Sequence, residues 1–287
     1  MIGAERLNGV RADLTSPGEF EPAQPLSAAE LSSTARLRIG RRVVASYVVS
    51  STNDVAFAAL ARDGELASGT AFVAETQTAG RGRRGRAWYA RPGRGVLLSV
   101  ALRVPSPPPP AAMVASAAVA VRDAIRSTAE LEATIKWPND LLIGGKKVCG
   151  ILVEARATEA RADFAMGIGV NVNDDPEHDF DPSVRGTATS LAAASGRTID
   201  RAAFARALLD HLDRRLSAML EGDRRDIEAE FVAGLGLEGR RVRLEVPGGE
   251  RTGVLRAFDG ARGVRLELAG GDAWIAAETI ARVAPEP

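Results

Sequence analysis

The sequence is poor in the residues that build metal centres and covalent cross-links. Its 287 residues include one cysteine, Cys149, and two histidines, His178 and His211. A single thiol excludes an intrachain disulfide framework and a cysteine-based zinc cage, and it suits a reducing compartment. Because the histidines lie far apart, one in a loop with Pro and Asp and one in a charged helical segment, we expect no protein-bound metal.

The sequence also lacks an excess of charge and long apolar runs. Lys+Arg and Asp+Glu both total 37, so there is no net basic field to attract nucleic acid or an anionic membrane. No stretch approaches the ~18 unbroken apolar residues that a membrane span requires. The N-terminus lacks the basic-then-apolar order of a signal peptide. We therefore expect a globular, cytoplasmic protein.

Lysine and the side-chain amides are scarce. Arginine accounts for 34 of the 37 basic residues, and the chain has only three Lys, two Gln and five Asn. In a chain that uses Arg for almost every positive charge, a Lys, Gln or Asn indicates a position that needs a compact ammonium or a neutral amide. Most of these residues gather in four windows, at 51–54, 77–88, 136–150 and 167–173. The four windows are therefore the candidate site.

The first 236 residues divide into a polar leader and an alternation of strand-like and helix-like segments. Residues 1–38, rich in Pro, Ser, Ala and Glu, predict a flexible leader with a short helix at 28–37. Residues 39–236 predict an α/β domain. Its expected strands lie at 41–49, 70–75, 95–103, 134–137, 148–154 and 164–172. Its expected helices lie at 52–62, 111–128, 200–220 and 223–235.

The pattern changes over residues 237–287. Short stretches of alternating apolar and charged residues are separated by turns that contain glycine. The expected strands lie near 242–246, 254–258 and 264–268. Such spacing predicts a small antiparallel barrel.

Residues 80–85 match the pattern GxGxxG, but they do not sit in the context of a dinucleotide site. That site needs the glycines to open a helix and an acid ~20 residues later. Here Trp, Tyr and Pro follow within 87–93, and positions 103–107 hold no acid. A kinase is excluded because no HRD or DFG sequence is present. What remains is a glycine loop whose arginines can bind phosphate or carboxylate oxygens; a solvated loop and a nucleic-acid-binding loop are the alternatives.

A second cationic motif lies at residues 136–140, Lys-Trp-Pro-Asn-Asp. It brings a lysine to the end of a strand, where α/β ligand sites lie. Gly144-Gly145-Lys146-Lys147 then predicts a turn with an ammonium at the mouth of the next strand, suited to stabilising charge on a reacting phosphate. A polar hairpin without a ligand is the alternative. Cys149, in that strand, is expected to be a small buried residue.

Five motifs, in this order, resemble those of the biotin protein ligases (biotin–[acetyl-CoA-carboxylase] ligases). They are Ser51-Thr52-Asn53, residues 77–88, Lys136-Trp137-Pro138-Asn139-Asp140, residues 145–154 and residues 167–173. The resemblance runs from about 42 to 284. It implies a catalytic α/β (α+β) domain at 39–236, with a mixed sheet related to class II aminoacyl-tRNA synthetases. An SH3-like β-barrel would follow at 237–287.

The resemblance also implies roles for individual residues. Lys147 and Arg83 would be catalytic, Lys147 by touching the biotin carboxylate and the α-phosphate and Arg83 by closing over the intermediate. The implied biotin-binding residues are Ser51, Thr52, Asn53, Gln77, Gly80, Arg81, Gly82, Arg83, Trp88, Lys147, Gly150, Gly167 and Gly169. The implied nucleotide-binding residues are Arg83, Arg84, Lys136, Asn139, Asp140, Lys147 and Asn171.

The implied reaction uses biotin, ATP and Mg²⁺ to form biotinyl-5′-AMP, from which biotin passes to a lysine of a biotin carboxyl carrier protein. Only about 40 residues precede the first strand, too few for the winged helix-turn-helix that some members carry. We therefore expect a monofunctional ligase, monomeric or homodimeric, with no sequence-specific DNA target. The alternatives are a lipoate or octanoyl protein ligase and a non-catalytic nucleic-acid-binding protein.

Overall fold

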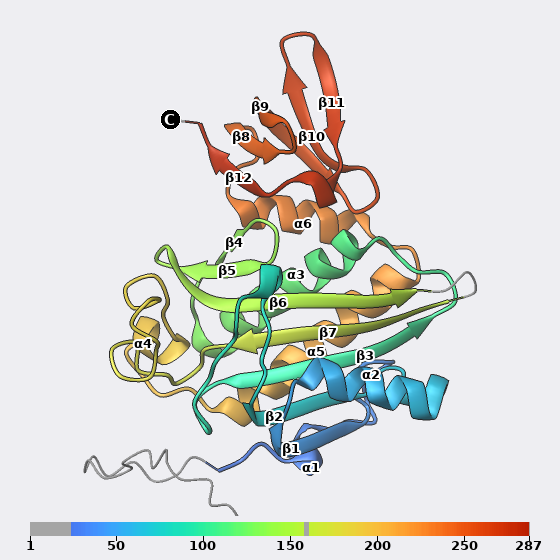
Figure 1. The fold of residues 1–287 in the computed structure, drawn as a ribbon, viewed down its shortest axis with the longest axis vertical. Helices are drawn as coiled ribbons and strands as arrows, with labels where there is room; N and C mark the ends of the chain where they lie inside the picture. Colours follow the sequence, from blue (N-terminus) through green and yellow to red (C-terminus); the bar gives the residue numbers. More distant parts are fainter. Residues whose placement is uncertain (1–23, 158–160, 287) are drawn as a thin grey trace, which may run out of the picture.

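The structure is a computed structural model that describes residues 24–157 and 161–286. Its centre is a seven-stranded mixed sheet with the strand order β1-β2-β3-β7-β6-β5-β4 (Figure 1). The strands are β1 (Val43–Val49), β2 (Ala71–Gln77), β3 (Val96–Val104), β4 (Thr134–Lys136), β5 (Asp140–Ile143), β6 (Lys146–Ala157) and β7 (Ala162–Val170). Only the β1–β2 pair is parallel within this sheet; the other neighbours run antiparallel.

All six strands predicted between 41 and 172 are present, and β5 is an additional one. It forms a hairpin with β6 through Gly144 and Gly145, which both have positive φ angles (56° and 77°). A turn with two left-handed residues matches the twist of the flanking strands. The motif at 136–140 thus spans the end of one strand and the start of the next, with Asp140 as the first residue of β5.

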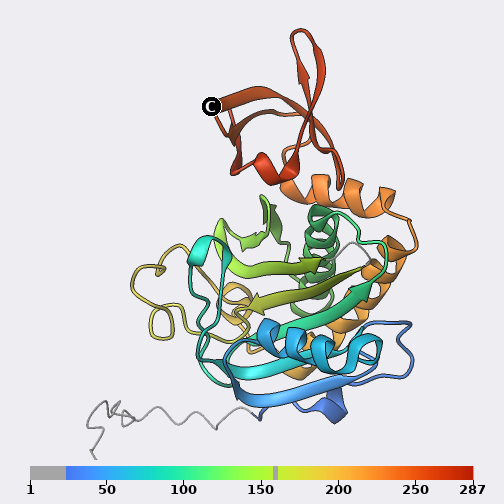
Figure 2. The ribbon, with the colours of Figure 1, turned by 45° about the vertical axis from the view of Figure 1, so that its right-hand side comes forward.

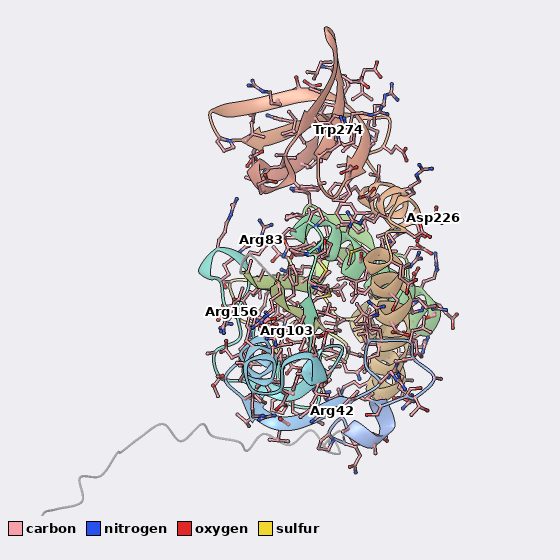
Figure 3. The ribbon with its side chains drawn as sticks, turned by 90° about the vertical axis from the view of Figure 1, so that its right-hand side faces the viewer. Arg42, Arg83, Arg103, Arg156, Asp226 and Trp274 are labelled. Carbon is pink, nitrogen blue, oxygen red and sulfur yellow. The ribbon has the colours of Figure 1, made fainter. Side chains whose placement is uncertain are left out.

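Helices cover both faces of the sheet (Figures 2 and 3). They are α2 (Thr52–Asp63) on one face, and α3 (Pro110–Ala129) and α5 (Arg201–Leu220) on the other, with α6 (Arg225–Leu235) beside α3. The buried residues of α3 are mostly alanine and valine, which allows close packing against α5 and the sheet. The side chain of Asp200 caps α5 by accepting a hydrogen bond from the Ala203 N–H (3.0 Å). The short helix α4 (Leu191–Ser195) was not predicted.

The described part of the predicted leader is folded against the domain. Residues 1–23 lie outside the described residues. The helix α1 (Ala28–Leu31) is shorter than the predicted 28–37. The helix ends where the backbone of Ser32 becomes extended. Farther on, the carboxylate of Asp213 accepts hydrogen bonds from the backbone N–H groups of residues 37–39, which keeps them out of a helix. Leu31 is fully buried, so the expectation of a flexible leader is wrong for residues 24–38.

The C-terminal segment forms a second sheet, which is entirely antiparallel and has the strand order β11-β10-β9-β8-β12. Its strands are β8 (Arg241–Val246), β9 (Gly249–Asp259), β10 (Gly263–Leu268), β11 (Gly271–Ile275) and β12 (Arg282–Pro285). The first three contain the predicted strands, whereas β11 and β12 were not predicted. No helix in the described residues is long and apolar enough to cross a membrane.

Three aromatic rings join the two sheets. Trp137, just after β4, makes edge contacts with Phe231 of α6 and Phe258 of β9, at centroid distances of 6.0 and 5.8 Å. The Trp137 indole N–H donates to the Ile280 carbonyl oxygen (3.1 Å). The pairing of edges with faces adds to the free energy gained by burying the rings. This cluster therefore fixes the C-terminal sheet against the β4–β5 end of the central sheet.

Removing one of the three rings tests the importance of this junction. Phe231 is 1% exposed, so Phe231→Ala is expected to lower the free energy of unfolding by about 3–5 kcal/mol through lost burial and the remaining cavity. Urea unfolding followed by tryptophan fluorescence measures this loss. Phe231→Leu, which keeps most of the volume, should lose less. A loss below about 1 kcal/mol for the alanine variant would contradict the assignment.

Candidate functional site

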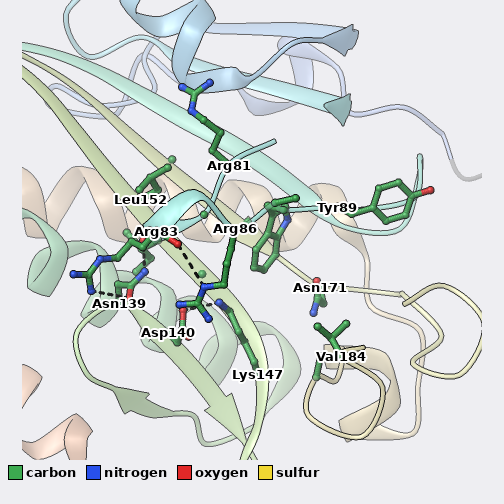
Figure 4. Close-up of a pocket in the computed structure, with 18 of the residues that line it drawn as sticks. Arg81, Arg83, Arg86, Tyr89, Asn139, Asp140, Lys147, Leu152, Asn171 and Val184 are labelled. Atoms are coloured by element: carbon green, nitrogen blue, oxygen red, sulfur yellow. Dashed lines mark hydrogen bonds and ion pairs between the residues drawn. The ribbon is translucent and has the colours of Figure 1, made fainter. Parts of the chain in front are cut away.

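One cavity of about 810 Å³ collects residues from all four windows (Figure 4). It lies against β6 and β7, below the loop that joins β2 to β3. The predicted site residues that line it are Ser51, Thr52, Asn53, Gln77, Arg81, Gly82, Arg83, Trp88, Lys136, Asn139, Asp140, Lys147, Gly150, Gly167, Gly169 and Asn171. Gly80 and Arg84 do not line it. Segments separated by more than 100 residues in the sequence thus meet at one site.

The floor of the cavity exists because three strand positions have no side chain. Gly150 of β6 pairs with Gly169 of β7, and Gly167 lies two residues before it. A Cβ atom at Gly169 would lie 2.5 Å from Trp88 Nε1, and one at Gly150 would lie 2.8 Å from Trp88 Cζ3. A Cβ atom at Gly167 would lie 2.7 Å from Asn53 Oδ1. Any other residue at these positions would displace the indole or the amide.

One end of the cavity is uncharged and polar. It is formed by the N-terminus of α2, where Ser51 is the N-cap residue but makes no side-chain capping bond. Instead Gln77, at the end of β2, accepts the Thr52 N–H at its Oε1 atom (2.8 Å). Capping therefore comes from a neighbouring strand, and it fixes Gln77 and Thr52 relative to each other on the cavity wall.

The loop over the cavity is tied down at its first residues. The Trp88 N–H donates to the Gly80 carbonyl oxygen (3.0 Å), and a Cβ at Gly80 would lie 2.3 Å from the Trp88 oxygen. Gly80 thus shapes the loop instead of lining the cavity. The Arg81 guanidinium points outward, with hydrogen bonds to both carboxylate oxygens of Asp54 (3.1 and 2.8 Å) and one to Glu154 (3.1 Å). Its hydrogen bonds lower the pKa of the Asp54 carboxyl.

The two arginines at the tip of the loop point to different places. The Arg83 side chain lies in the cavity, with Nη1 3.4 Å from Asn139 Oδ1 (Figure 4). Burial, followed by the nearby charge of Arg84, lowers the pKa of the Arg83 guanidinium. Arg84 has a left-handed backbone (φ 59°). It lines a second hollow of about 370 Å³, which Arg83 also borders, beside Glu245 and Glu278 of the C-terminal segment. Arg84 does not line the larger cavity, and its assignment to the nucleotide stays a prediction.

The other end of the cavity is cationic. Lys147 Nζ is 2.6 Å from Asp140 Oδ1 and 5.3 Å from the centroid of the Trp88 ring. Asn139 donates from Nδ2 to the Ile151 carbonyl oxygen (2.7 Å), which turns its own oxygen toward Arg83. Figure 4 shows Arg86, one of the loop arginines expected to bind phosphate or carboxylate but given no individual role, extending toward Asp140 and Lys147. Three cations therefore converge on this end of the cavity.

A third wall of the cavity was not predicted from the sequence. It comes from residues 180–188, including Phe180, Val184 and Ala188. This segment is held to β6 because the Lys147 N–H donates to the Thr187 carbonyl oxygen (2.8 Å) and the Lys147 carbonyl oxygen accepts from the Thr189 N–H (2.8 Å). The segment has no motif; its one signal is a pair of isolated apolar residues in a polar loop.

Two further expectations concern Cys149 and metals. Cys149 is fully buried, and burial raises the pKa of its thiol, as expected for a core residue that is not a nucleophile. Within residues 24–157 and 161–286, no group of three or more His, Cys, Asp or Glu side chains is arranged to hold a metal ion.

Comparison with known proteins places the chain in a family. The family model described as "Biotin/lipoate A/B protein ligase family" matches residues 45–172. The biotin–[acetyl-CoA-carboxylase] ligase of Mycobacterium tuberculosis is 35% identical over 218 residues, which cover 74% of this chain and 78% of that protein. The chain belongs to the biotin/lipoate A/B protein ligase family.

Other family members agree with this placement. The bifunctional ligase/repressor BirA of Bacillus subtilis is 41% identical over 185 residues, 62% of this chain. Those residues are 54% of that protein, so the chain spans about half the length of the first curated relatives that it matches. A structure of the biotin protein ligase from Aquifex aeolicus in complex with biotin and ATP has a TM-score of 0.68 and 25% identity. It covers 85% of this chain and 99% of that one. The family match spans nearly all of the four windows but ends before the wall at 180–188.

Two buried acidic residues, Asp174 and Asp179, precede that wall along the chain. Asp174, 3% exposed, has no hydrogen-bond partner for its Oδ2 atom within the described part of the chain. Burial, and then the nearby charge of Asp179, raises the pKa of Asp174 to about 7. Asp179 in turn pairs with Arg91 of the loop over the cavity (3.2 Å). The wall and the loop therefore meet at a pair of acidic residues.

The raised pKa of Asp174 predicts a pH-dependent stability. In the unfolded chain the carboxyl loses its proton near its ordinary pKa of 3.8, whereas the folded protein keeps the proton up to about pH 7. Stability therefore falls as pH rises through this interval. Asp174→Asn should abolish this loss of stability with rising pH. At pH 8 its free energy of unfolding should exceed that of the wild type by roughly 2–4 kcal/mol.

Urea unfolding at pH 5, 6.5 and 8 measures this difference. The matched control is Asp175→Asn, because Asp175 is an exposed neighbour whose pKa is lowered and which stays ionised over this range. Identical pH slopes for the wild type and Asp174→Asn would show that Asp174 is not the responsible group.

Proposed function

We propose that the protein is an ATP-dependent biotin ligase, which activates biotin as biotinyl-5′-AMP and transfers it to a lysine of a biotin carboxyl carrier protein. The observation that carries this proposal is the polarity of the cavity. It has a neutral polar end at Thr52 and Gln77, an apolar glycine floor under Trp88, and a cationic end at Lys147 and Arg83. Biotin has the same order of groups: a ureido ring, an apolar tail and a carboxylate.

The proposed binding mode follows from that order. The ureido group lies against Ser51, Thr52 and Gln77. The tail crosses Gly150 and Gly169 beside the indole of Trp88. The carboxylate then reaches Lys147 and replaces Asp140, which pairs with Lys147 in the structure (2.6 Å). The apolar wall at 180–188 suits a nucleobase beside Asn171, and the phosphates lie among the cations.

In the first step, an oxygen of the biotin carboxylate attacks the α-phosphorus of ATP, and the bond to the bridging oxygen of pyrophosphate breaks. Two anions must approach each other, so the catalytic contribution is electrostatic and positional, with no general base required. Lys147, Arg83 and Arg86 supply the positive charge. Mg²⁺ would enter as part of MgATP, and a phosphate-bound Mg²⁺ usually keeps several waters. Asp140, the carboxylate at this end of the cavity, would be the residue to hold the hydrated ion, which would neutralise charge on the phosphates.

In the second step, the amine of a carrier lysine attacks the acyl carbon of the mixed anhydride. AMP leaves with the electrons of the acyl–oxygen bond, an amide forms, and the amine loses a proton. The activated acyl group also reacts with water, so the loop that carries Arg83 must cover it until the carrier arrives. Both steps therefore use the same cationic end of the cavity.

The two sheets support the proposed division into a catalytic domain at 39–236, of the class II aminoacyl-tRNA synthetase type, and an SH3-like domain at 237–287. The mixed sheet and the segments that flank it provide the site residues, and the antiparallel sheet borders the loop at the hollow that Arg83 and Arg84 line. A cytoplasmic location, a monomer or homodimer, and the absence of a DNA target stay predictions from the sequence.

The direct test is to incubate the protein with ATP, Mg²⁺, biotin and an isolated carrier domain, and to detect the mass gain on one lysine. Lipoate and octanoate in parallel reactions test the alternative acyl ligase. A nucleic acid titration tests the non-catalytic alternative. Transfer of lipoate but not biotin, or binding of nucleic acid without biotin transfer, would overturn the proposal.

Lys147 provides a first test of the mechanism. Lys147→Ala removes the ammonium nearest the proposed carboxylate site, so adenylation should fall at least about 100-fold. Biotin-dependent exchange of pyrophosphate into ATP measures this step without the carrier. Lys146→Ala is the matched control, because Lys146 is exposed and does not line the cavity. Normal exchange by the Lys147 variant would show that its assigned role is wrong.

Arg83 provides a second test, which concerns retention of the intermediate. Arg83→Gly should still form biotinyl-5′-AMP but release it about 10-fold or more faster, because the closing guanidinium is lost. Release is measured as free adenylate in the absence of carrier. Arg84→Gly is the control, since Arg84 points away from the cavity and already has a backbone conformation that glycine adopts. Equal leakage from the two variants would contradict the role of Arg83.

A further inference from the structure

Two polar residues that do not line the cavity hold the residues that do. Ser99 of β3 is fully buried, and its Oγ atom lies 2.6 Å from Asn53 Oδ1 and 2.7 Å from Thr52 Oγ1. Glu154 of β6 accepts a hydrogen bond at its Oε2 atom from Asn53 Nδ2 (2.6 Å). The residues therefore form a continuous chain from Glu154 through Asn53 and Ser99 to Thr52.

The direction of each hydrogen bond in this chain follows from counting protons. The Asn53 amide nitrogen faces Glu154 and the Leu152 carbonyl oxygen (3.3 Å), two groups that only accept. The Asn53 oxygen must then face Ser99. A carbonyl oxygen cannot donate, so the single hydroxyl proton of Ser99 goes to Asn53.

The contact between Ser99 and Thr52 is then left with one possible donor. Because the Ser99 proton is committed, the 2.7 Å contact requires the proton of Thr52. The other acceptor near that hydroxyl, Gln77 Oε1, is farther away (3.1 Å) and already accepts the Thr52 N–H. Thr52 Oγ1 thus presents lone pairs to the cavity that it lines.

We propose that Ser99 and Glu154 are positioning residues that fix the Thr52 hydroxyl as an acceptor, and that the site thereby selects a ligand head with an N–H donor. This inference rests on the proposed function, in which that donor is a ureido N–H of biotin. The dithiolane of lipoate and the alkyl end of octanoate have no donor. Asn53, whose two amide hydrogens go to protein acceptors and whose oxygen accepts from Ser99, positions Thr52 instead of donating to the ligand.

The structure around the chain is built to keep it in place. Gly167 pairs with Ser99 on β3 and with Leu152 on β6, and its missing side chain leaves the space in which Asn53 lies on the sheet. Glu154 is held by Arg81 (3.1 Å). A charged acceptor strengthens the bond to the Asn53 amide and thus the orientation of the whole chain.

The test uses Ser99→Ala, which removes the hydroxyl without adding volume. Titration calorimetry of the full chain, without nucleotide, measures binding of biotin and of two analogues in which one or the other ring N–H is replaced by oxygen. For the wild type, one analogue should bind about 100-fold more weakly than biotin, because an acceptor would face an acceptor. In Ser99→Ala the Thr52 hydroxyl is free to turn and donate. The ratio of the affinity for biotin to the affinity for this analogue (the analogue ratio) should therefore fall at least about 5-fold, and biotin itself should bind about 10-fold more weakly than to the wild type.

The matched control is Ser116→Ala, which removes an equally buried hydroxyl that donates to the Ala112 carbonyl oxygen in α3. It should leave both the affinity for biotin and the analogue ratio unchanged. Glu154→Gln is a second variant at a partly exposed position. Like Ser99→Ala, it should lower the ratio of the affinity for biotin to the affinity for the analogue. Its control is Glu267→Gln, which removes another Arg-paired carboxylate, in the C-terminal sheet.

The outcomes separate this inference from the function on which it rests. If the wild type binds biotin but Ser99→Ala keeps the wild-type analogue ratio, the proton chain is wrong and the proposed ligase stands. If biotin binds more weakly at an unchanged ratio, Ser99 supports the fold only, and the inference fails. If the wild type does not bind biotin at all, the proposed function and the inference fail together.

Discussion

The site depends on the absence of side chains from adjacent positions on two central strands. Side chains on a sheet face normally fill the space beneath the covering helix. Here Gly150, Gly167 and Gly169 leave that space open, and an indole and an amide enter it. Without this bare patch the polar residues at the start of α2 and the cations on β6 would be separated by packed side chains. A ligand with groups at both ends could not span them.

A second constraint is the placement of arginine in a chain that uses it for almost every cation. The loop over the cavity is fixed where Arg81 meets Asp54 and Glu154 (2.8 and 3.1 Å). It is fixed again where the Gly93 N–H donates to the buried carboxylate of Glu75 (2.9 Å). Arg83 lies between these anchors, so it is carried by a segment held at both ends. Such a loop can open and close without unfolding the sheet below it.

The sequence allowed much of the site to be predicted, for a physical reason. Lysine and side-chain amides are chemically specific, so their scarcity made their few positions informative, and glycine on a strand indicates close approach of other groups. The wall at 180–188 could not be predicted, because backbone hydrogen bonds to Lys147 hold it beside the cavity. Backbone hydrogen bonds of this kind leave no sequence motif. The outward turn of Arg84 depends on a left-handed backbone at a residue other than glycine, which composition does not indicate. The packing of residues 24–38 depends on Asp213, about 175 residues away along the chain.

The C-terminal sheet contributes to the site without lining the cavity. Trp137 is packed between the two sheets and donates to Ile280, and it lies two residues before Asn139. The Asn139 side chain donates a hydrogen bond to the Ile151 carbonyl oxygen on β6 (2.7 Å). The next residue, Asp140, begins β5 and forms the ion pair with Lys147. A shift of the C-terminal sheet would therefore move Trp137, and with it the corner of the central sheet that positions both the amide facing Arg83 and the acid facing Lys147. The aromatic junction thus couples the placement of the cationic end of the cavity to the packing of a sheet whose described residues do not line it.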